Sequence, residues 1–207
     1  VSGNVSFYNQ TKEVGIKPTP SIGGVGLIKD YKKMVTMDFK KIDNLVLVIG
    51  KTEGHIDQSL FARSILDEKN GPPPEVNLFN EKNNGESLLN LINKDYIQSA
   101  HDISLGGLIT AISKMCIQGN KGIKLKKANN FVNELEYLFC EDQGRYIIEI
   151  KPEDLKEVTN LLDKNSVHYD ELGIITDKEM IINQKTKLTI DELKSYYTNW
   201  LTNYMSA

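Results

Sequence analysis

Short apolar runs alternate with helical repeats along the chain from about residue 44 onward. Residues 45–49 are an unbroken apolar run that ends at Gly50, which is typical of a central strand buried on both faces. Similar runs predict further strands at residues 96–100, 122–125, 146–150, 172–175 and 180–182. Apolar residues at helical spacing predict helices at residues 58–66, 87–94, 108–117 and 130–139, and after Pro152. The order predicts an α/β (α+β) domain with a mixed sheet and flanking helices.

The last helix is the most strongly marked element. Thr189 and Glu192 have the spacing of a capping box, in which two side chains satisfy backbone N–H groups at the start of a helix. Apolar and aromatic residues follow at helical spacing: Leu193, Tyr196, Tyr197, Trp200, Leu201 and Tyr204. We expect this stripe to pack in the core or at an interface between domains.

The first 30 residues have a different pattern. Residues 5–8 and the glycine-rich residues 22–28 predict two extended segments, and the polar residues 9–20 predict a loop between them. Because two strands are not stable alone, we expect them to pair with strands that precede Val1 in a longer polypeptide. Residues 1–30 are therefore predicted to be the tail of one domain and residues 31–207 a second domain.

Composition narrows the function only slightly. The 207 residues carry a formal net charge of −3, which disfavours nucleic acid as the main partner. No apolar run approaches the roughly 20 residues of a membrane-spanning helix, and the first residues do not resemble a secretory leader. We therefore expect the cytoplasm as the compartment. Cys116 and Cys140 lie in apolar surroundings without C-x-x-C spacing, so we expect buried thiols and no disulfide.

The first candidate site is Ser2-Gly-Asn-Val-Ser6. Glycine allows close approach of a phosphate, and an asparagine carbonyl is an oxygen ligand suited to Mg²⁺. Alternation along a strand places Asn4 and Ser6 on one face, where both could meet one ligand. A structural Gly-Asn turn is the alternative interpretation.

Three further motifs carry polar groups. Residues 101–107, His-Asp-Ile-Ser-Leu-Gly-Gly, precede a predicted helix, where a glycine pair could bind an anion or permit tight packing, with Asp102 or Ser104 as the helix cap. Residues 141–145, Glu-Asp-Gln-Gly-Arg, could hold a metal or act in acid–base chemistry, but an ion-paired surface turn is favoured. His55 could act as a base, although nothing nearby in the sequence orients it.

The order of these motifs identifies a family. Their sequence along the chain is Ser-Gly-Asn-Val-Ser-Phe-Tyr-Asn (2–9), Pro-Thr-Pro (18–20), Gly-Gly-Val-Gly-Leu-Ile (23–28), Val-Leu-Val-Ile-Gly (46–50), Gly-Pro-Pro-Pro (71–74), Ala-His-Asp-Ile-Ser-Leu-Gly-Gly-Leu (100–108) and Glu-Asp-Gln-Gly-Arg-Tyr (141–146). Over its whole length, the chain resembles the C-terminal part of the phosphoribosylformylglycinamidine synthase family, the large synthetase subunit of purine biosynthesis. The resemblance implies a C-domain like that of aminoimidazole ribonucleotide synthetase, preceded by the last strands of an N-domain.

The resemblance also implies a reaction and its site. It implies a ligase that uses ATP to convert formylglycinamide ribonucleotide and ammonia to the formylglycinamidine ribonucleotide, with ADP and phosphate as products. A separate glutaminase subunit releases the ammonia from glutamine, and a small bridging subunit joins the bacterial complex. By the match to the family's Gly-Asn-x-Ser motif, Gly3 contacts ATP, Asn4 binds Mg²⁺ and Ser6 contacts the ribonucleotide. The family's catalytic histidine lies upstream, so we expect no catalytic residue in this chain and no activity of the chain alone.

The chain departs from the family pattern in three places. Leu105 replaces the aspartate that usually precedes the glycine pair, Cys140 replaces the glycine before Glu-Asp-Gln, and Asp57-Gln58 replaces a glycine-rich stretch. Two alternative functions stay open. The chain could belong to another ATP-dependent enzyme of the same superfamily, or it could be a non-catalytic scaffold that docks a glutaminase partner.

Overall fold

The computed structural model describes residues 10–15, 23–126 and 133–206 of the chain. These residues fall into two compact units, Val1–Tyr31 and Lys32–Ala207. The assignment of residues 1–30 and 31–207 to two domains stays a prediction.

The first unit contains a short hairpin where the sequence predicted a loop. Strands β1 (Gln10–Thr11) and β2 (Val14–Gly15) pair antiparallel, and Lys12 adopts the positive φ of 56° that a tight turn needs. The strand predicted at residues 22–28 is wrong for its described part, since residues 23–28 form no strand and are exposed. A strand needs a hydrogen-bonded neighbour, and none of the described residues pairs with this run. The segment predicted at residues 5–8 lies outside the described residues.

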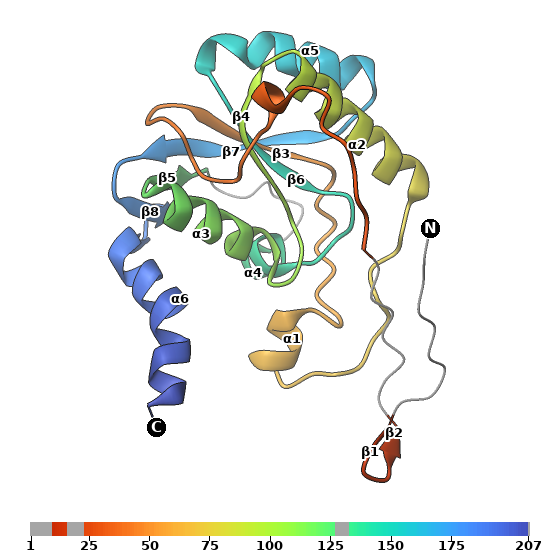
Figure 1. Cartoon of the computed structure of the whole chain (residues 1–207), viewed down its shortest axis with the longest axis vertical. Helices are drawn as coiled ribbons and strands as arrows, with labels where there is room; N and C mark the ends of the chain where they lie inside the picture. Colours follow the sequence, from red (N-terminus) through yellow and green to blue (C-terminus); the bar gives the residue numbers. More distant parts are fainter. Residues whose placement is uncertain (1–9, 16–22, 127–132, 207) are drawn as a thin grey trace. The chain divides into compact units, whose positions relative to one another are not determined.

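The second unit is built on a seven-stranded mixed sheet, which confirms the predicted fold class. Its strand order is β4-β6-β3-β7-β5-β8-β9 (Figure 1). Neighbours are antiparallel except for β5 and β8, which are parallel. The strands are β3 (Leu45–Ile49), β4 (Ile97–Asp102), β5 (Gly122–Leu125), β6 (Tyr146–Ile150), β7 (Tyr169–Thr176), β8 (Glu179–Ile182) and β9 (Thr186–Thr189).

Helices cover both faces of this sheet. Figure 1 shows α2 (Leu78–Asn93) and α5 (Leu155–Lys164) on one face, and α3 (Gly107–Gly119) and α4 (Glu134–Phe139) on the other. The short helices are η1 (Tyr31–Lys33), α1 (Leu60–Ser64) and η2 (Pro152–Asp154), and the chain ends with α6 (Ile190–Met205). None of the helices among the described residues is both long and apolar enough to cross a membrane.

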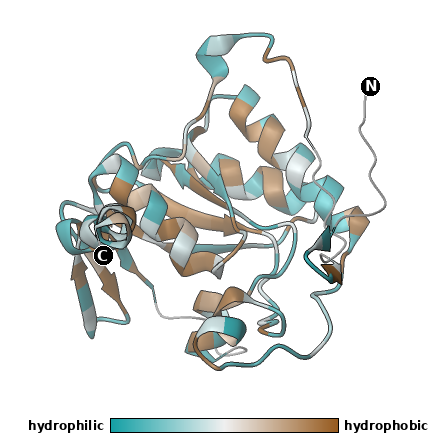
Figure 2. Cartoon of the chain, turned by 60° about the horizontal axis from the view of Figure 1, so that its bottom comes forward, coloured by the Kyte–Doolittle hydropathy of each residue, from teal (hydrophilic) through white to brown (hydrophobic). Residues whose placement is uncertain are grey.

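The central strand explains the unbroken apolar run. Val46 and Val48 pack into a core cluster with α3 and α4, whereas Leu47 and Ile49 pack into a second cluster with α2 and α5. All four side chains are at most 1% exposed, because successive strand residues point to opposite faces and both faces are covered. Figure 2 shows the same layering, with hydrophobic strands between helices of mixed character.

Within the second unit, the structure differs from prediction at the start of α2 and at β9. Helix α2 begins at Leu78, nine residues before the predicted start. Asn77 caps it, and residues 80–86 contain no apolar side chain whose periodicity could predict a helix there. Strand β9 was not predicted, since its side chains are mostly exposed and form only an edge hairpin with β8.

The structure also tests the predictions for the last helix and for the two cysteines. The capping box is confirmed, with Thr189 and Glu192 each accepting the other's backbone N–H at the start of α6. Both cysteines are buried and free, as predicted. Of the apolar stripe of α6, Leu193 packs against the core, whereas Tyr196, Tyr197, Trp200, Leu201 and Tyr204 are exposed among the described residues.

A buried carboxylate on β6 holds three segments of the chain together. Glu149 of β6 is fully buried and accepts hydrogen bonds from the backbone N–H groups of Lys40 and Lys41. The side chains of Asn44 and Ser99 donate to the same carboxylate at 2.7 Å. This role could not be predicted from the sequence, because the partners of Glu149 lie 50 to 109 residues away along the chain.

Candidate functional site

Strand register brings separate motifs together at one end of the sheet. The last residue of β3, Ile49, and the last residue of β4, Asp102, both pair with the first residue of β6, Tyr146. The loops at residues 50–59, 103–106 and 140–145 therefore meet at this end. These loops contain or adjoin His55, the His-Asp-Ile-Ser-Leu-Gly-Gly motif and the Glu-Asp-Gln-Gly-Arg motif, which the sequence presented as independent candidates.

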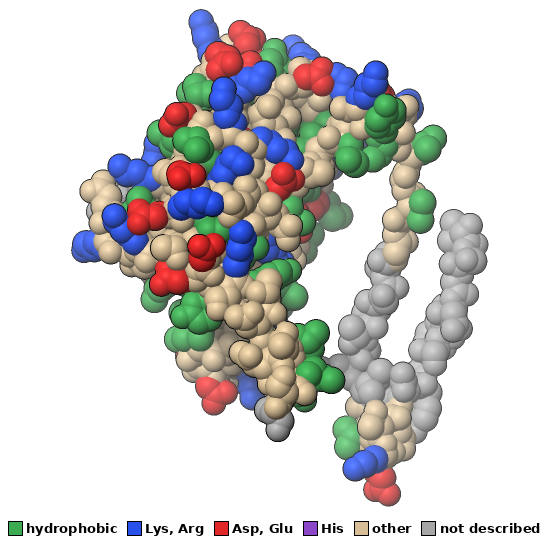
Figure 3. All heavy atoms as spheres, turned by 60° about the vertical axis from the view of Figure 1, so that its left-hand side comes forward, with side chains coloured by type: hydrophobic (Ala, Val, Ile, Leu, Met, Phe, Trp, Pro, Cys, Tyr) green, Lys and Arg blue, Asp and Glu red, His purple; other side chains and the backbone are tan. Residues whose placement is uncertain are grey.

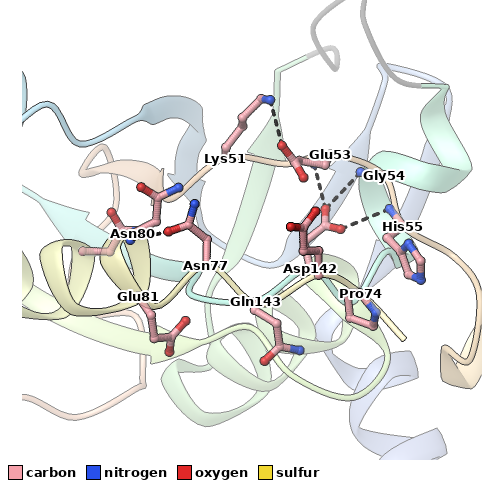
Figure 4. A pocket seen from close by; sticks show the side chains of 12 residues that line it. Lys51, Glu53, Gly54, His55, Pro74, Asn77, Asn80, Glu81, Asp142 and Gln143 are labelled. Atoms are coloured by element: carbon pink, nitrogen blue, oxygen red, sulfur yellow. Dashed lines mark hydrogen bonds and ion pairs between the residues drawn. The ribbon is translucent and has the colours of Figure 1, made fainter. Parts of the chain in front are cut away.

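A polar cavity of about 520 Å³ lies among these loops and the start of α2 (Figure 4). Its lining is formed by Lys51, Glu53, Gly54, His55, Pro74, Glu75, Asn77, Asn80, Glu81, Asn84, Asp142 and Gln143. A second cavity of about 360 Å³ shares Glu81 and Gln143 with the first. The lining residues before and in α2 were not predicted from the sequence as candidate site residues. The asparagine-rich run at residues 77–84 is the signal that could have indicated them, because it marks a polar surface.

Asp142 organises the loop after β3. Its carboxylate accepts the backbone N–H groups of Glu53, Gly54 and His55 at 2.7, 2.9 and 3.1 Å (Figure 4). The residue is 7% exposed, and both of its oxygens are used. Charge-assisted hydrogen bonds of this kind are strong, so Asp142 fixes the loop.

Glu141 occupies the anion position at the start of α3. Its Oε1 accepts the N–H of Gly106 at 2.8 Å and the N–H of Leu60, the first residue of α1, at 2.7 Å. The N–H of Gly107 donates to the carbonyl oxygen of Ser104 at 3.0 Å. The helix end therefore binds the chain's own carboxylate, as the positive end of a helix dipole favours.

The glycine pair is required by packing. Gly106 and Gly107 have φ of +82° and +69°, and a Cβ on Gly107 would lie 2.7 Å from backbone atoms of Phe139 and Cys140. Of the two interpretations of this motif, the structure supports tight packing. The expected cap by Asp102 or Ser104 is wrong, since Gly106 is the N-cap and no side chain in the described part of the chain caps α3.

Arg145 is a buried structural cation. It is 1% exposed and donates to the carbonyl oxygens of Asp142 and Cys140 and to the Thr52 hydroxyl, at 3.2, 2.7 and 3.2 Å. The expectation of an ion-paired surface turn is wrong, because Arg145 forms no ion pair within the described residues and both Asp142 and Arg145 are buried. Backbone carbonyls replace the carboxylate as its partners.

His55 is oriented by the proline loop that follows α1. Its ring Nε2 lies 2.9 Å from the carbonyl oxygen of Pro72. The Gln58 side chain donates to the carbonyl oxygens of Lys69 and Gly71 at 2.9 and 3.0 Å. His55 and Gln58 together hold the Gly-Pro-Pro-Pro segment, which agrees with a structural role for both.

His101 and Tyr146 border a third, larger cavity. This hollow of about 770 Å³ is lined by residues of β4, the 35–38 segment, Leu88, Gln118 and Tyr146. The His101 Nδ1 lies 3.0 Å from the Asp102 carboxylate, and its buried Nε2 has no hydrogen-bond partner among the residues that the structure describes. Burial raises the pKa of the Tyr146 hydroxyl, and the nearby carboxylates of Glu81 and Asp102 add to the rise.

The described residues contain no group of three or more His, Cys, Asp or Glu side chains placed to hold a metal. In the polar cavity, the neighbouring Glu53 carboxylate raises the pKa of the Lys51 ammonium. The residues predicted to contact ATP, Mg²⁺ and the ribonucleotide, Gly3, Asn4 and Ser6, lie outside the described residues. Their roles stay predictions.

A family model shows which family the chain belongs to. Residues 41–183 match the model described as "AIR synthase related protein, C-terminal domain", and the chain belongs to that family. The sequence is 70% identical over 205 residues to the phosphoribosylformylglycinamidine synthase subunit PurL of Pelagibacter ubique. This confirms the resemblance drawn from the motifs. The match covers 99% of this chain and 28% of that relative, so the chain spans little more than a quarter of the relative's length.

Solved structures of PurL from Thermotoga maritima share the fold. They include PurL complexed with FGAR (TM-score 0.64, 16% identity), the PurLQS structure (0.61, 17%) and PurL complexed with ATP (0.60, 15%). Each covers 78% of this chain, and this chain covers 29%, 28% and 27% of the respective solved chains. At these identities the likeness concerns the fold alone.

Proposed function

We propose that this chain is part of an ATP-dependent phosphoribosylformylglycinamidine synthase, a ligase of purine biosynthesis. The observation that carries the proposal is the 70% identity over 205 residues to the Pelagibacter ubique subunit. The motif Gly3-Asn4-Val5-Ser6 in its family position supports it. The cytoplasm is the proposed compartment.

In the proposed reaction, ATP phosphorylates the amide oxygen of formylglycinamide ribonucleotide to give an iminophosphate. Ammonia then displaces phosphate and leaves the formylglycinamidine. Gly3 would contact ATP, Asn4 would offer its carbonyl oxygen to Mg²⁺, and Ser6 would donate to the ribonucleotide. Mg²⁺ supplies positive charge that offsets the negative charge concentrated during phosphoryl transfer.

The polar cavity at the end of the sheet has a supporting role in this proposal. Asp142 accepts three backbone N–H groups, Glu141 accepts two through its Oε1, and Arg145 donates to two backbone carbonyl oxygens, so they fix the surrounding loops. The departure from the family pattern at Leu105 is compatible with this proposal. It is 60% exposed, so the aspartate usual in the family would stand at a surface position of the loop that starts α3.

The proposed partners are a glutaminase subunit that supplies ammonia and a small bridging subunit. The solved Thermotoga maritima structure named PurLQS supports this assembly for that relative. The remaining alternatives are another ATP-dependent activity of the same superfamily and a scaffold role without catalysis. Both would leave the ribonucleotide unconverted by the full-length protein.

The test measures synthase activity of the full-length protein that contains this chain, with ATP, ammonia and varied Mg²⁺. We expect turnover of formylglycinamide ribonucleotide by the full-length protein and none by the 207-residue chain alone. Replacing Asn4→Ala should raise the Mg²⁺ concentration for half-maximal activity at least about 10-fold, since one oxygen ligand is lost. Asn90→Ala, on an exposed part of α2, is the matched control and should change nothing.

Three results would count against the proposal. Absence of turnover by the full-length protein would remove the assigned activity. Turnover by the 207-residue chain alone would contradict the upstream location of the catalytic residues. An unchanged Mg²⁺ dependence in the Asn4→Ala protein would remove the metal role of Asn4 while leaving the reaction in place.

A further inference from the structure

The C-terminal part of α6 has no partner within the described residues. Of the sixteen residues in this helix, only Ile190 is buried, and Leu193 and Lys194 are partly covered. Every residue from 195 to 205 is exposed. The helix thus begins on the core and then leaves it (Figure 1).

The exposed part carries an apolar face about half the circumference of the helix wide. This α6 face consists of Tyr196, Tyr197, Trp200, Leu201, Tyr204 and Met205, each between 57% and 79% exposed. At 100° per residue these six positions share one side, whereas Ser195 and Asn199 lie on the opposite side. Trp200 and Tyr204 stack with their ring centroids 5.6 Å apart, which presents a preformed aromatic surface.

A hollow extends this face toward the body of the domain. It measures about 290 Å³ and lies between α3 and α6, with Ile109, Ile117, Leu193, Tyr196 and Tyr197 among its lining residues. Figure 3 shows this side of the molecule: red and blue side chains crowd its upper part, and green and tan surface prevails lower down, where α6 projects.

Such a helix is not expected to be stable in water by itself. Residues 195–205 contain no charged residue, although 26% of the chain is charged. They are rich in Tyr, Thr and Asn, which are weak helix formers, and isolated helices shorter than roughly 12–15 residues are marginal in water. The stability of this half of α6 must therefore come from burial of its apolar face against another protein surface.

We propose that the α6 face docks against another domain of the same polypeptide, in the part that the relatives have and this chain does not span. The proposal rests on the proposed function, which makes the chain one part of a longer synthase subunit. The chain spans only 28% of the Pelagibacter ubique relative, so most of such a polypeptide lies outside the structure.

The chemistry of the face favours a permanent partner in the same polypeptide. Interfaces that are always covered resemble a domain core and are depleted in charge, whereas interfaces that open and close are about as polar as the rest of the surface. An aromatic face left bare whenever a separate subunit dissociates would promote aggregation. A membrane surface is disfavoured, since residues 195–205 contain no Lys or Arg to attract anionic lipid.

The experiment compares hydrogen exchange of peptides covering residues 195–205 in two proteins: the 207-residue chain and the full-length subunit purified without other subunits. We expect these amides to exchange at least about 10-fold more slowly in the full-length subunit, because docking suppresses the local unfolding of the helix that exchange requires. In the full-length subunit, Trp200→Lys should abolish that protection. Asn199→Lys is the matched control, since it adds the same charge on the opposite side of the helix, and it should keep the protection.

Each other outcome would overturn the proposal. Protection that appears only after the glutaminase and bridging subunits are added would assign the face to a partner subunit. Protection in the 207-residue chain that grows with protein concentration would assign it to a second copy. Equal exchange in every sample would mean that nothing covers the face. The exchange measurement does not depend on turnover, so failure of the proposed reaction and failure of this proposal are distinguishable.

Discussion

Adjacent carboxylates at residues 141 and 142 bind backbone groups of different loops. Glu141 joins the start of α1 to the turn before α3, and Asp142 gathers three successive N–H groups of the loop after β3. Arg145 lies behind them and binds carbonyl oxygens of the same turn. Backbone groups of these loops have no partners in a helix or strand, and the charged side chains satisfy them with hydrogen bonds.

Replacing Asp142→Asn should destabilise the protein by about 2 kcal/mol. The amide removes the negative charge and turns one acceptor into a donor that faces N–H groups, which leaves buried donors without partners. The free energy of unfolding from urea titration measures the effect. Glu75→Gln is the control, because Glu75 lines the same cavity but is exposed, and it should change stability by less than about 0.5 kcal/mol. Equal stability of the two variants would contradict the structural role of Asp142.

The two thiols give a pH dependence at the alkaline end. Burial raises the pKa of Cys116 from 9.0 to about 12 and that of Cys140 from 9.0 to about 11. Between pH 9 and 11 the unfolded chain loses thiol protons that the folded chain keeps. This deprotonation lowers the free energy of the unfolded state relative to the folded state. The stabilisation is complete below pH 9 and is lost as pH rises toward the folded pKa values.

We expect the free energy of unfolding to fall by up to about 1.4 kcal/mol per pH unit for each thiol above pH 9. Denaturant titrations at pH 8, 9, 10 and 10.5 measure this slope. The Cys116→Ala/Cys140→Ala double variant should have a flatter slope over the same range, even if it is less stable throughout. Parallel slopes in the two proteins would show that the buried thiols do not control the alkaline loss.

At the scale of elements, the close contact between the backbone at the start of α3 and the backbone at the end of α4 decides where α3 can begin. The helix end packs against the end of α4, so Gly107 has no room for a side chain. The same crossing positions the Glu141 carboxylate at the start of α3. A glycine in the middle of α2, Gly85, has no such constraint, since its nearest neighbour would be the Tyr146 hydroxyl at 3.8 Å from a Cβ.

The two glycines should therefore respond to alanine in opposite directions. Gly107→Ala adds a Cβ in a left-handed conformation and against backbone atoms, so we expect a loss of about 3 kcal/mol. Gly85→Ala lies within a helix and should gain about 0.5–1 kcal/mol, because alanine lowers the entropy of the unfolded chain. Thermal unfolding of the pair measures both signs, and a stable Gly107→Ala protein would contradict the packing interpretation.

At the scale of the molecule, the two core clusters belong to the second unit. No described residue before Phe39 is a buried member of either cluster, and Phe39 itself is 1% exposed and bonds through its N–H to the Met115 carbonyl oxygen. Lys33 is anchored in the same unit through the Asn93 carbonyl oxygen at 3.1 Å. We therefore expect the second unit to fold without residues 1–31, because the buried residues of both core clusters lie within it.

A chain that begins at Lys32 should unfold cooperatively with a midpoint within about 2 °C of that of the full 207 residues, a change below about 1 kcal/mol. A chain that begins at Asn44 is the comparison, since it also removes Phe39 and should unfold at a clearly lower temperature. Calorimetry measures both midpoints. A large drop on removing residues 1–31 would mean that the first unit supports the second.

Much of the second unit could be predicted from local pattern. The strands at residues 122–125 and 146–150 begin and end as predicted, and the capping box at Thr189 starts its helix. Polar segments were harder, because the first turns of α2 are stabilised by a cap and by contacts distant in sequence. The aromatic stripe of α6 has helical spacing whether or not the chain itself covers it, so periodicity alone could not decide its burial.

The order of apolar runs and motifs by itself determined the α/β class, the central buried strand and the family, since these depend on side-chain periodicity and on residues close in sequence. Only the tertiary structure decided that the loops at His55, Gly106 and Glu141 meet, because strand register joins them across about 90 residues. It also decided that Glu141, Asp142 and Arg145 bind backbone groups, since a charged side chain's partners depend on which backbone atoms the fold leaves unpaired beside it.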